Sequence, residues 1–265
     1  MPVTTANAID VYYERAGSGP PVLFLNGSGA TLTTSALLIQ PFTERLDVVA
    51  YDQRGLGKTA IPPGPYSMAD YAADAAALLD EVGWERCRVV GVSFGGMVAQ
   101  ELTVTWPERI ERLALVCTSP GGAGGASYPL HELASLPASA RAERSIRILD
   151  TRFDAEWLAS HPSDRMLVEM MAKRSAGEKT AEQLRGEAEQ LDARRRHDVC
   201  DRLARITCPT LVAAGRYDGI APLANSEAIV ARVPSAELRV YEGGHAFLAQ
   251  DPKAIPEVID FLAAP

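Results

Sequence analysis

Apolar residues follow two different spacings along this chain. Short continuous apolar runs alternate with longer segments in which apolar residues recur every three or four positions. The short runs predict strands buried on both faces of a parallel sheet, and the longer segments predict amphipathic helices. Strands that alternate with helices indicate right-handed βαβ units, so we expect an α/β fold. The predicted strands span 9–13, 21–25, 46–51, 88–92, 113–117, 209–214 and 238–241.

The first strand and the helix after the Pro-rich loop have clear end signals. Residues 9–13 alternate in part and stop before a Gly-Ser-Gly-Pro turn, which predicts an edge strand that opens a hairpin. Ser67 is a good N-cap for a helix through about Glu81, and Asp70 lies in its first turn. Apolar residues at helical spacing give this helix one buried face, and Asp70, Asp74 and Glu81 fall outside that face.

The alternation of strands and helices stops in the middle of the chain. A glycine-rich joint at 119–125 is followed only by predicted helices, at about 138–150, 165–173 and 181–203. We therefore expect residues 1–119 and 206–265 to form an α/β core, with residues 120–205 inserted into it as a helical cap, or lid. Such a cap would set the size of the substrate, and its glycine joint would let it open.

The composition is that of an ordinary globular protein, since 47% of the 265 residues are hydrophobic and 23% are charged. The formal net charge of −8 argues against a nucleic acid as partner and against an anionic membrane surface. The basic cluster Arg194 to Arg196 is flanked by Asp192 and Asp198, and we expect it to be a solvated helix face. We therefore expect a small molecule as the partner, and nothing in the sequence indicates an oligomeric state.

The cysteines and the N-terminal residues indicate in which cellular compartment the protein is expected. The four cysteines form no Cys-x-x-Cys pair, and none lies at metal-ligand spacing from a histidine, so we expect no metal site and a reducing environment. Residues 1–6 carry neither the basic nor the apolar part of a signal peptide. No apolar run approaches the roughly 20 residues that span a bilayer. We therefore expect a cytoplasmic protein.

A serine stands at the apex of a predicted strand, turn and helix. Glycines lie two positions before and two positions after Ser93, in the nucleophile-elbow pattern Gly-x-Ser-x-Gly. A sharp turn projects the hydroxyl clear of the backbone, and glycines are needed because the strand and the helix pass in contact there. The turn also aims the helix N-terminus, whose free amides favour negative charge, at the same place. The pattern predicts Ser93 as a nucleophile.

A nucleophilic serine needs a base within hydrogen-bond reach and an acid that orients this base. Such groups gather at the carboxyl ends of parallel strands. Asp218 follows the predicted strand at 209–214, and His245 follows the strand at 238–241 beside two glycines. We therefore predict a triad of Ser93, His245 and Asp218. The other histidines lie in the predicted cap and are expected at the surface or at helix ends: His131, His161 and His197.

Two backbone amides are expected to form an oxyanion hole, which stabilises a carbonyl oxygen as it becomes negative. The first is the amide of Phe94, directly after the nucleophile. The second should come from the loop Asn26-Gly27-Ser28-Gly29, which follows an early strand, with Ser28 preferred and Gly29 next.

Two glycine-containing segments fail to match phosphate-binding motifs. Leu32 stands where a dinucleotide fingerprint beginning at Gly27 would have its third glycine. Asp52 stands where a phosphate loop ending in Lys58-Thr59 would have its first glycine. We expect Asp52 and Arg54 to fix the loop beside the site rather than to take part in catalysis.

Four segments of this sequence together resemble the α/β-hydrolase superfamily. They are Asp52-Gln53-Arg54-Gly55, Gly91-Val92-Ser93-Phe94-Gly95, Gly215-Arg216-Tyr217-Asp218 and Gly243-Gly244-His245. The resemblance covers essentially the whole core, and the order Ser93, Asp218, His245 is that of the superfamily. Residues 62–66 and the loop at Asn26 are similar to the 3-oxoadipate enol-lactonase branch, although the superfamily often has His where Asn26 stands.

The resemblance implies a mostly parallel sheet with an inserted cap. It also implies hydrolysis of a carboxylic ester or lactone through an acyl-enzyme, without a metal or an organic cofactor. The same triad serves C–C bond hydrolysis of diketones and cofactor-free haloperoxidase or perhydrolase chemistry, because these activities differ in pocket shape. A non-catalytic small-molecule receptor on this fold is a further alternative, and the intact Ser, Asp and His argue against it.

Overall fold

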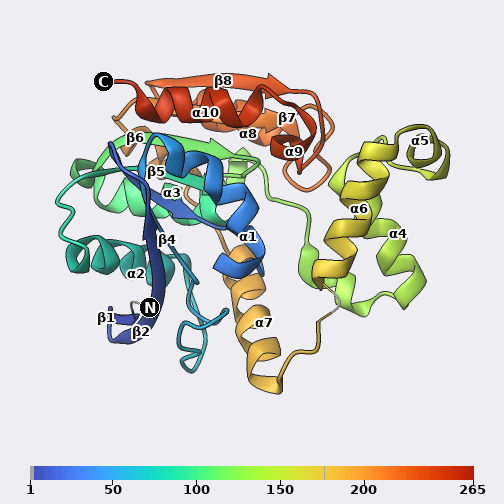
Figure 1. Ribbon diagram of the computed structural model, residues 1–265, viewed down its shortest axis with the longest axis horizontal. Helices are drawn as coiled ribbons and strands as arrows, with labels where there is room; N and C mark the ends of the chain where they lie inside the picture. The colour runs from blue at the N-terminus through green and yellow to red at the C-terminus, as the bar shows by residue number, and fades with distance from the viewer. Residues whose placement is uncertain (1–2, 176) are drawn as a thin grey trace.

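The chain folds around one eight-stranded sheet with the strand order β1-β2-β4-β3-β5-β6-β7-β8. The computed structural model describes residues 3–175 and 177–265; residues 1, 2 and 176, which fall in the predicted core and cap, lie outside the described residues. Helices cover both faces of the sheet (Figure 1). The strands are β1 (Val3–Ala6), β2 (Ile9–Ala16), β3 (Pro21–Leu25), β4 (Asp47–Tyr51), β5 (Cys87–Val92), β6 (Ile110–Val116), β7 (Thr210–Gly215) and β8 (Ala236–Tyr241).

Each predicted strand and helix has a counterpart in the structure, and most ends differ by a few residues. The helix predicted over 181–203 is an exception, because it ends at Arg195 and a separate 3-10 helix, Cys200–Arg205, follows it. The sequence pattern does not predict the short helices α5 and α9. No helix within the described ranges is both long enough and apolar enough to cross a membrane. The helices are α1 (Leu32–Ile39), α2 (Met68–Glu81), α3 (Phe94–Thr105), α4 (Ala138–Leu149), α5 (Ala155–Ser160), α6 (Pro162–Ser175), α7 (Ala181–Arg195), α8 (Leu223–Val230), α9 (Phe247–Gln250) and α10 (Ala254–Ala263).

The N-terminal edge of the sheet differs from the prediction. Residues 9–13 are not an edge strand, because they belong to β2, which pairs antiparallel with β1 on one side and with β4 on the other. The edge strand is β1, joined to β2 by a turn in which Asn7 and Ala8 have positive φ angles of 49° and 61°. Two successive positive φ angles are typical of a type I′ hairpin turn.

From β4 through β3 to β8, each strand is parallel to the next strand in the sheet. Both faces of this part of the sheet are buried. Val89 belongs to the hydrophobic cluster beneath α2, α3 and α8, and the next residue, Val90, belongs to the cluster beneath α1 and α10. Strand side chains alternate between faces, so burial on both sides explains the continuous apolar runs. The carboxyl ends of the parallel strands meet at one edge.

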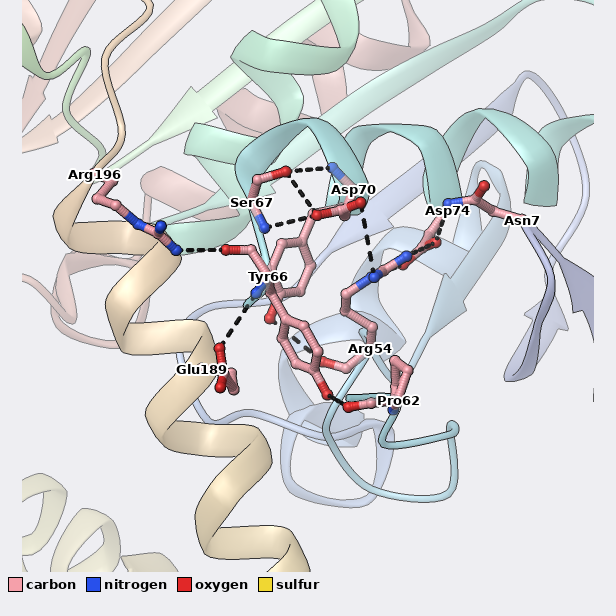
Figure 2. A network of polar contacts seen from close by, with 10 residues as sticks. Asn7, Arg54, Pro62, Tyr66, Ser67, Asp70, Asp74, Glu189 and Arg196 are labelled. Atoms are coloured by element: carbon pink, nitrogen blue, oxygen red, sulfur yellow. Dashed lines mark hydrogen bonds and ion pairs between the residues drawn. The ribbon is translucent and has the colours of Figure 1, made fainter. Parts of the chain in front are cut away.

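Helix α2 begins as predicted. Ser67 Oγ accepts a hydrogen bond from the Asp70 amide, and the Asp70 carboxylate accepts one from the Ser67 amide, which is a reciprocal capping box. Asp74, however, is fully buried on this helix although it falls outside the apolar stripe. It accepts two hydrogen bonds from Arg54, at 2.6 and 2.7 Å, as Figure 2 shows.

The segment 120–205 carries α4 to α7. Helices α4, α5 and α6 stand together beside the sheet, whereas α7 runs back along the core (Figure 1). The two ends of the segment meet in an antiparallel bridge between Gly121 and Asp198. Gly121 has a φ of 73°, and a Cβ there would lie 2.0 Å from the carbonyl oxygen of His197. The predicted glycine joint is therefore closely packed at this point.

Candidate active site

The turn between β5 and α3 has the geometry that the glycine pattern predicts. Ser93 has a φ of 56° and a ψ of −112°, a conformation that L-residues rarely adopt and that is frequent at functional sites. A Cβ on Gly91 would lie 2.4 Å from the carbonyl oxygen of Gly95, and a Cβ on Gly95 would lie 2.0 Å from that of Leu25. Both glycines are thus required by the close passage of strand and helix.

The structure brings Ser93, His245 and Asp218 together from three separate strand ends. His245 Nε2 lies 2.9 Å from Ser93 Oγ, and His245 Nδ1 lies 2.8 Å from Asp218 Oδ2. The other carboxylate oxygen of Asp218 accepts hydrogen bonds from the amides of Ile220 and Ala221 at 2.7 and 2.8 Å. Asp218 is buried, and these bonds hold its carboxylate in one orientation.

The neighbouring strands β7 and β8 set the positions of the acid and the base. Gly215 and Tyr241 are paired at the ends of these strands, and the Tyr217 amide donates to the Gly243 carbonyl at 2.9 Å. The His245 amide donates to the carbonyl of Leu149, the last residue of α4. The segment 120–205 therefore contacts the loop that carries the histidine.

The two segments that carry the predicted oxyanion amides lie next to the nucleophile. Phe94 is the first residue of α3. The loop at Gly27 is close to Ser93 as well, because a Cβ added to Gly27 would lie 3.6 Å from the Ser93 Cβ. The Gly29 amide, the second choice in this loop, already donates to Gln190 Oε1 at 2.8 Å. Within the described part of the chain, the amides of Phe94 and Ser28 donate no hydrogen bond. This arrangement favours Ser28 over Gly29.

Asp52 and Arg54 have structural contacts, as predicted. Asp52 is buried and accepts hydrogen bonds from the amides of Leu32 and Lys58 at 2.7 and 2.9 Å, which join two loops beside the site. Burial raises the pKa of the Asp52 carboxyl.

Within the described ranges, no group of three or more His, Cys, Asp and Glu side chains is arranged to hold a metal ion.

The prediction for the basic cluster is wrong for one of its three members. Arg195 and Arg196 are half-exposed and pair with Asp192. Arg194 instead points inward and is only 5% exposed. Its Nη1 donates to the Tyr128 carbonyl at 2.7 Å.

Of the two places predicted for the cap histidines, the surface or a helix end, His197 has the second. It stands at the end of α7 but is 6% exposed, and burial lowers its pKa to about 4. His161 is exposed and His131 is partly exposed.

The buried face of α7 consists of Gly186, Gln190, Ala193 and Arg194. The small residues Gly186 and Ala193 at helical spacing are the signal that marks this face in the sequence.

The chain can also be compared with known proteins. A model of the alpha/beta hydrolase fold family matches residues 20–252. The chain belongs to the α/β hydrolase fold family. This α/β hydrolase is 33% identical over 255 residues to a poly(3-hydroxyalkanoate) depolymerase of Ectopseudomonas oleovorans, and the match covers 91% of this chain and 84% of the depolymerase. It is 27% identical over 259 residues to 3-oxoadipate enol-lactonase 2 of Acinetobacter baylyi, covering 97% and 94% of the two chains.

A solved structure agrees with the fold. The crystal structure of the enol-lactonase from Burkholderia xenovorans LB400 matches with a TM-score of 0.79 at 22% identity, covering 99% of this chain and 100% of that one. The predicted α/β-hydrolase fold and the resemblance to the enol-lactonase branch are confirmed. The α/β hydrolase is thus a member of a family of hydrolytic enzymes with lactonase and depolymerase relatives.

Proposed function

We propose that this α/β hydrolase cleaves a carboxylic ester or lactone of a small molecule by serine catalysis. The observation that carries the proposal is the continuous chain of hydrogen bonds from Ser93 Oγ through His245 to Asp218, at 2.9 and 2.8 Å. The depolymerase and enol-lactonase relatives support an ester or lactone as the bond that is cleaved.

The proposed reaction begins with attack of Ser93 Oγ on the substrate carbonyl. His245 Nε2 takes the hydroxyl proton and then delivers it to the leaving alcohol oxygen. Asp218 holds the tautomer in which His245 Nδ1 carries a proton, and it stabilises the imidazolium that forms. His245 next takes a proton from the water that attacks the acyl-enzyme, and it returns this proton to Ser93 Oγ as the bond to the acyl group breaks and the acid leaves.

The amides of Phe94 and Ser28 are proposed to donate to the oxyanion in both tetrahedral intermediates. In known enzymes the loss of one such donor raises the barrier by about 2.7–4 kcal/mol. The positive end of α3 points at the same oxygen, because Ser93 caps this helix.

We propose that residues 120–205 act as a cap over this site. Three contacts support it: the Gly29 amide bonds Gln190, the His245 amide bonds the Leu149 carbonyl, and Arg194 lies close enough to Asp218 to interact with its charge. The cap would then set which substrates reach Ser93.

A substrate panel tests the proposed function. It contains p-nitrophenyl esters of rising chain length, enol-lactones and diketones, assayed with and without a serine-directed phosphonate. We expect turnover of an ester or lactone that the phosphonate abolishes. Turnover of diketones alone would indicate a C–C bond hydrolase, and binding without turnover across the panel would indicate a receptor; either result contradicts the proposal.

A further inference from the structure

The inner face of α7 presents two side chains with unused hydrogen-bond donors. Gln190 and Arg194 lie one helical turn apart and are 1% and 5% exposed. Gln190 accepts from the Gly29 amide, and Arg194 donates from Nη1 to the Tyr128 carbonyl. Gln190 Nε2 and Arg194 Nε and Nη2 are buried and have no hydrogen-bond partner in the described part of the chain. All three unused atoms are donors, so they suit an acceptor group.

Arg194 is a buried cation. No carboxylate of residues 3–175 or 177–265 lies within ion-pair distance of its guanidinium. Burial lowers the pKa of Arg194 to about 10, and the charge of Asp218 opposes this shift, so the side chain remains a cation at neutral pH. Buried charges in proteins are normally paired, because an unpaired one loses its hydration without compensation. A bound anion would supply the missing partner.

A cavity of about 100 Å³ borders this guanidinium. Its lining includes Met97, Ser119, the buried Arg194 and the half-exposed Arg195, which is paired with Asp192, and it contains no Asp or Glu. A water molecule takes about 30 Å³ of liquid volume, so the cavity holds a group of a few heavy atoms. A carboxylate fits this size, and its single charge matches the single buried guanidinium.

Two residues that line the cavity, Met97 and Ser119, are near neighbours of the nucleophile's backbone. Met97 is one turn along α3 from Ser93, and its amide donates to the Ser93 carbonyl at 3.3 Å. On another side, Ser119 follows Thr118, whose hydroxyl donates to the same carbonyl at 2.8 Å. One helical turn rises about 5.4 Å, so a few carbon atoms would join a group in this cavity to a carbonyl at Ser93.

Helix α7 is held firmly on its other side, which keeps the two side chains in place. Figure 2 shows the Tyr66 amide donating to Glu189 at 3.2 Å and Arg196 donating to the Tyr66 carbonyl at 2.8 Å. Arg185 also donates to the carbonyls of Ile61 and Pro62. The donors therefore need little reorganisation to bind an anion.

We propose that Arg194, in the cavity that its guanidinium lines, binds a carboxylate of the substrate. The preferred substrate is then an ester or lactone that carries a carboxylate a few carbon atoms from the carbonyl attacked by Ser93. This inference rests on the proposed function for the identity of the reacting bond, but the anion site itself does not.

Two matched substrate pairs test the proposal. The first is the p-nitrophenyl monoester of glutaric acid and its neutral isostere, in which isopropyl replaces the carboxylate. The second places the charge on the alcohol, as m-carboxyphenyl acetate and m-isopropylphenyl acetate. We compare kcat/KM of the wild type with Arg194→Met and with Arg194→Gln, which retains a donor for the Tyr128 carbonyl. Arg205→Met is the control, because it removes the same charge from an exposed position at the end of the short 3-10 helix that follows α7, Cys200–Arg205.

In at least one pair, the preference for the anionic ester should fall about tenfold or more in both Arg194 variants, mainly through KM. The neutral ester should react as in the wild type, which shows that the variants are folded, and Arg205→Met should retain the preference. An unchanged preference in both pairs would overturn the proposal.

A binding measurement separates this proposal from the proposed function. Glutarate is titrated calorimetrically into the wild type and into Arg194→Met. If the wild type hydrolyses no ester, the proposed function fails, but glutarate binding that Arg194→Met loses still supports the anion site. Binding that is equal in the two proteins, or absent from both, counts against the site.

Discussion

The Gly29 amide donates a 2.8 Å hydrogen bond to Gln190 Oε1, and this bond joins the proposed oxyanion loop to α7. The two residues are 161 positions apart in the chain. The bond occupies the Gly29 amide and leaves the Ser28 amide free of partners within the described residues. The helix thus selects which amide of the loop is open to a substrate oxygen.

Replacement of Gln190 tests this relationship. Gln190→Ala removes the acceptor, so the loop is free to rotate and the Ser28 amide is held less firmly. We expect kcat to fall about fivefold, the value of one neutral hydrogen bond. The control is Glu187→Ala on the same helix, which removes only a partly exposed contact with Lys179. Equal kcat values in the two variants would contradict the role of the bond.

Replacement of Ser93 separates its chemistry from its backbone strain. Both Ser93→Ala and Ser93→Gly should lose at least about 10⁴-fold in kcat and all phosphonate labelling. Because Ser93 has a φ of 56°, glycine should relieve strain that alanine retains. We expect Ser93→Gly to be more stable to urea than Ser93→Ala by about 1–2 kcal/mol. Residual labelling of either variant would exclude Ser93 as the nucleophile.

His197 should make the protein sensitive to acid. Burial lowers its pKa to about 4, below the value of about 6.5 in an unfolded chain, so the unfolded state binds the proton more readily. Its contribution to stability is fully present above pH 6.5 and is lost as the pH falls toward 4, by up to about 3 kcal/mol. Nearby Glu101 and Asp198 favour protonation and reduce this loss.

The measurement is urea unfolding at pH 7 and pH 5. His197→Gln should lose less stability between the two pH values than the wild type does. His161→Gln is the matched control, because it removes a histidine from an exposed position. The prediction fails if the wild type and His197→Gln show the same loss.

The buried pair of Arg54 and Asp74 should be a major determinant of stability. Asp74→Ala leaves Arg54 without its bidentate partner and should lower the free energy of unfolding by about 3–5 kcal/mol. Asp80→Ala, on the exposed side of the same helix, should lower it by less than about 1 kcal/mol. Replacement of both partners, as Arg54→Met with Asp74→Leu, should recover part of the loss. Similar losses for Asp74→Ala and Asp80→Ala would contradict this.

Local patterns predict most of the fold. The strands of the parallel sheet are continuous apolar runs, and the start of α2 follows from Ser67 and Asp70, which are three residues apart. The turn at Ser93 follows from two glycines within five residues. These features depend on neighbours in the chain, so the sequence contains the whole of their physical cause.

Features that depend on distant partners escape the same reasoning. β1 has little pattern of its own and is a strand because it pairs with β2. Asp74 falls on the polar face of its helix by spacing, so the pattern predicts an exposed side chain. It is buried instead, because Arg54 lies opposite and pairs with it. Arg194 looks like part of a solvated basic run, yet α7 packs so that this one side chain turns inward.

The sequence by itself determined the α/β class, the elbow at Ser93 and the order in which Ser93, Asp218 and His245 follow their strands. Parallel strands place their carboxyl ends at one edge, so this order was enough to predict that the three would meet. Only the tertiary structure decided the Ser93–His245 distance, the free amide of Ser28 and the inward face of α7. These depend on how segments more than 100 residues apart pack, and no local spacing encodes that packing.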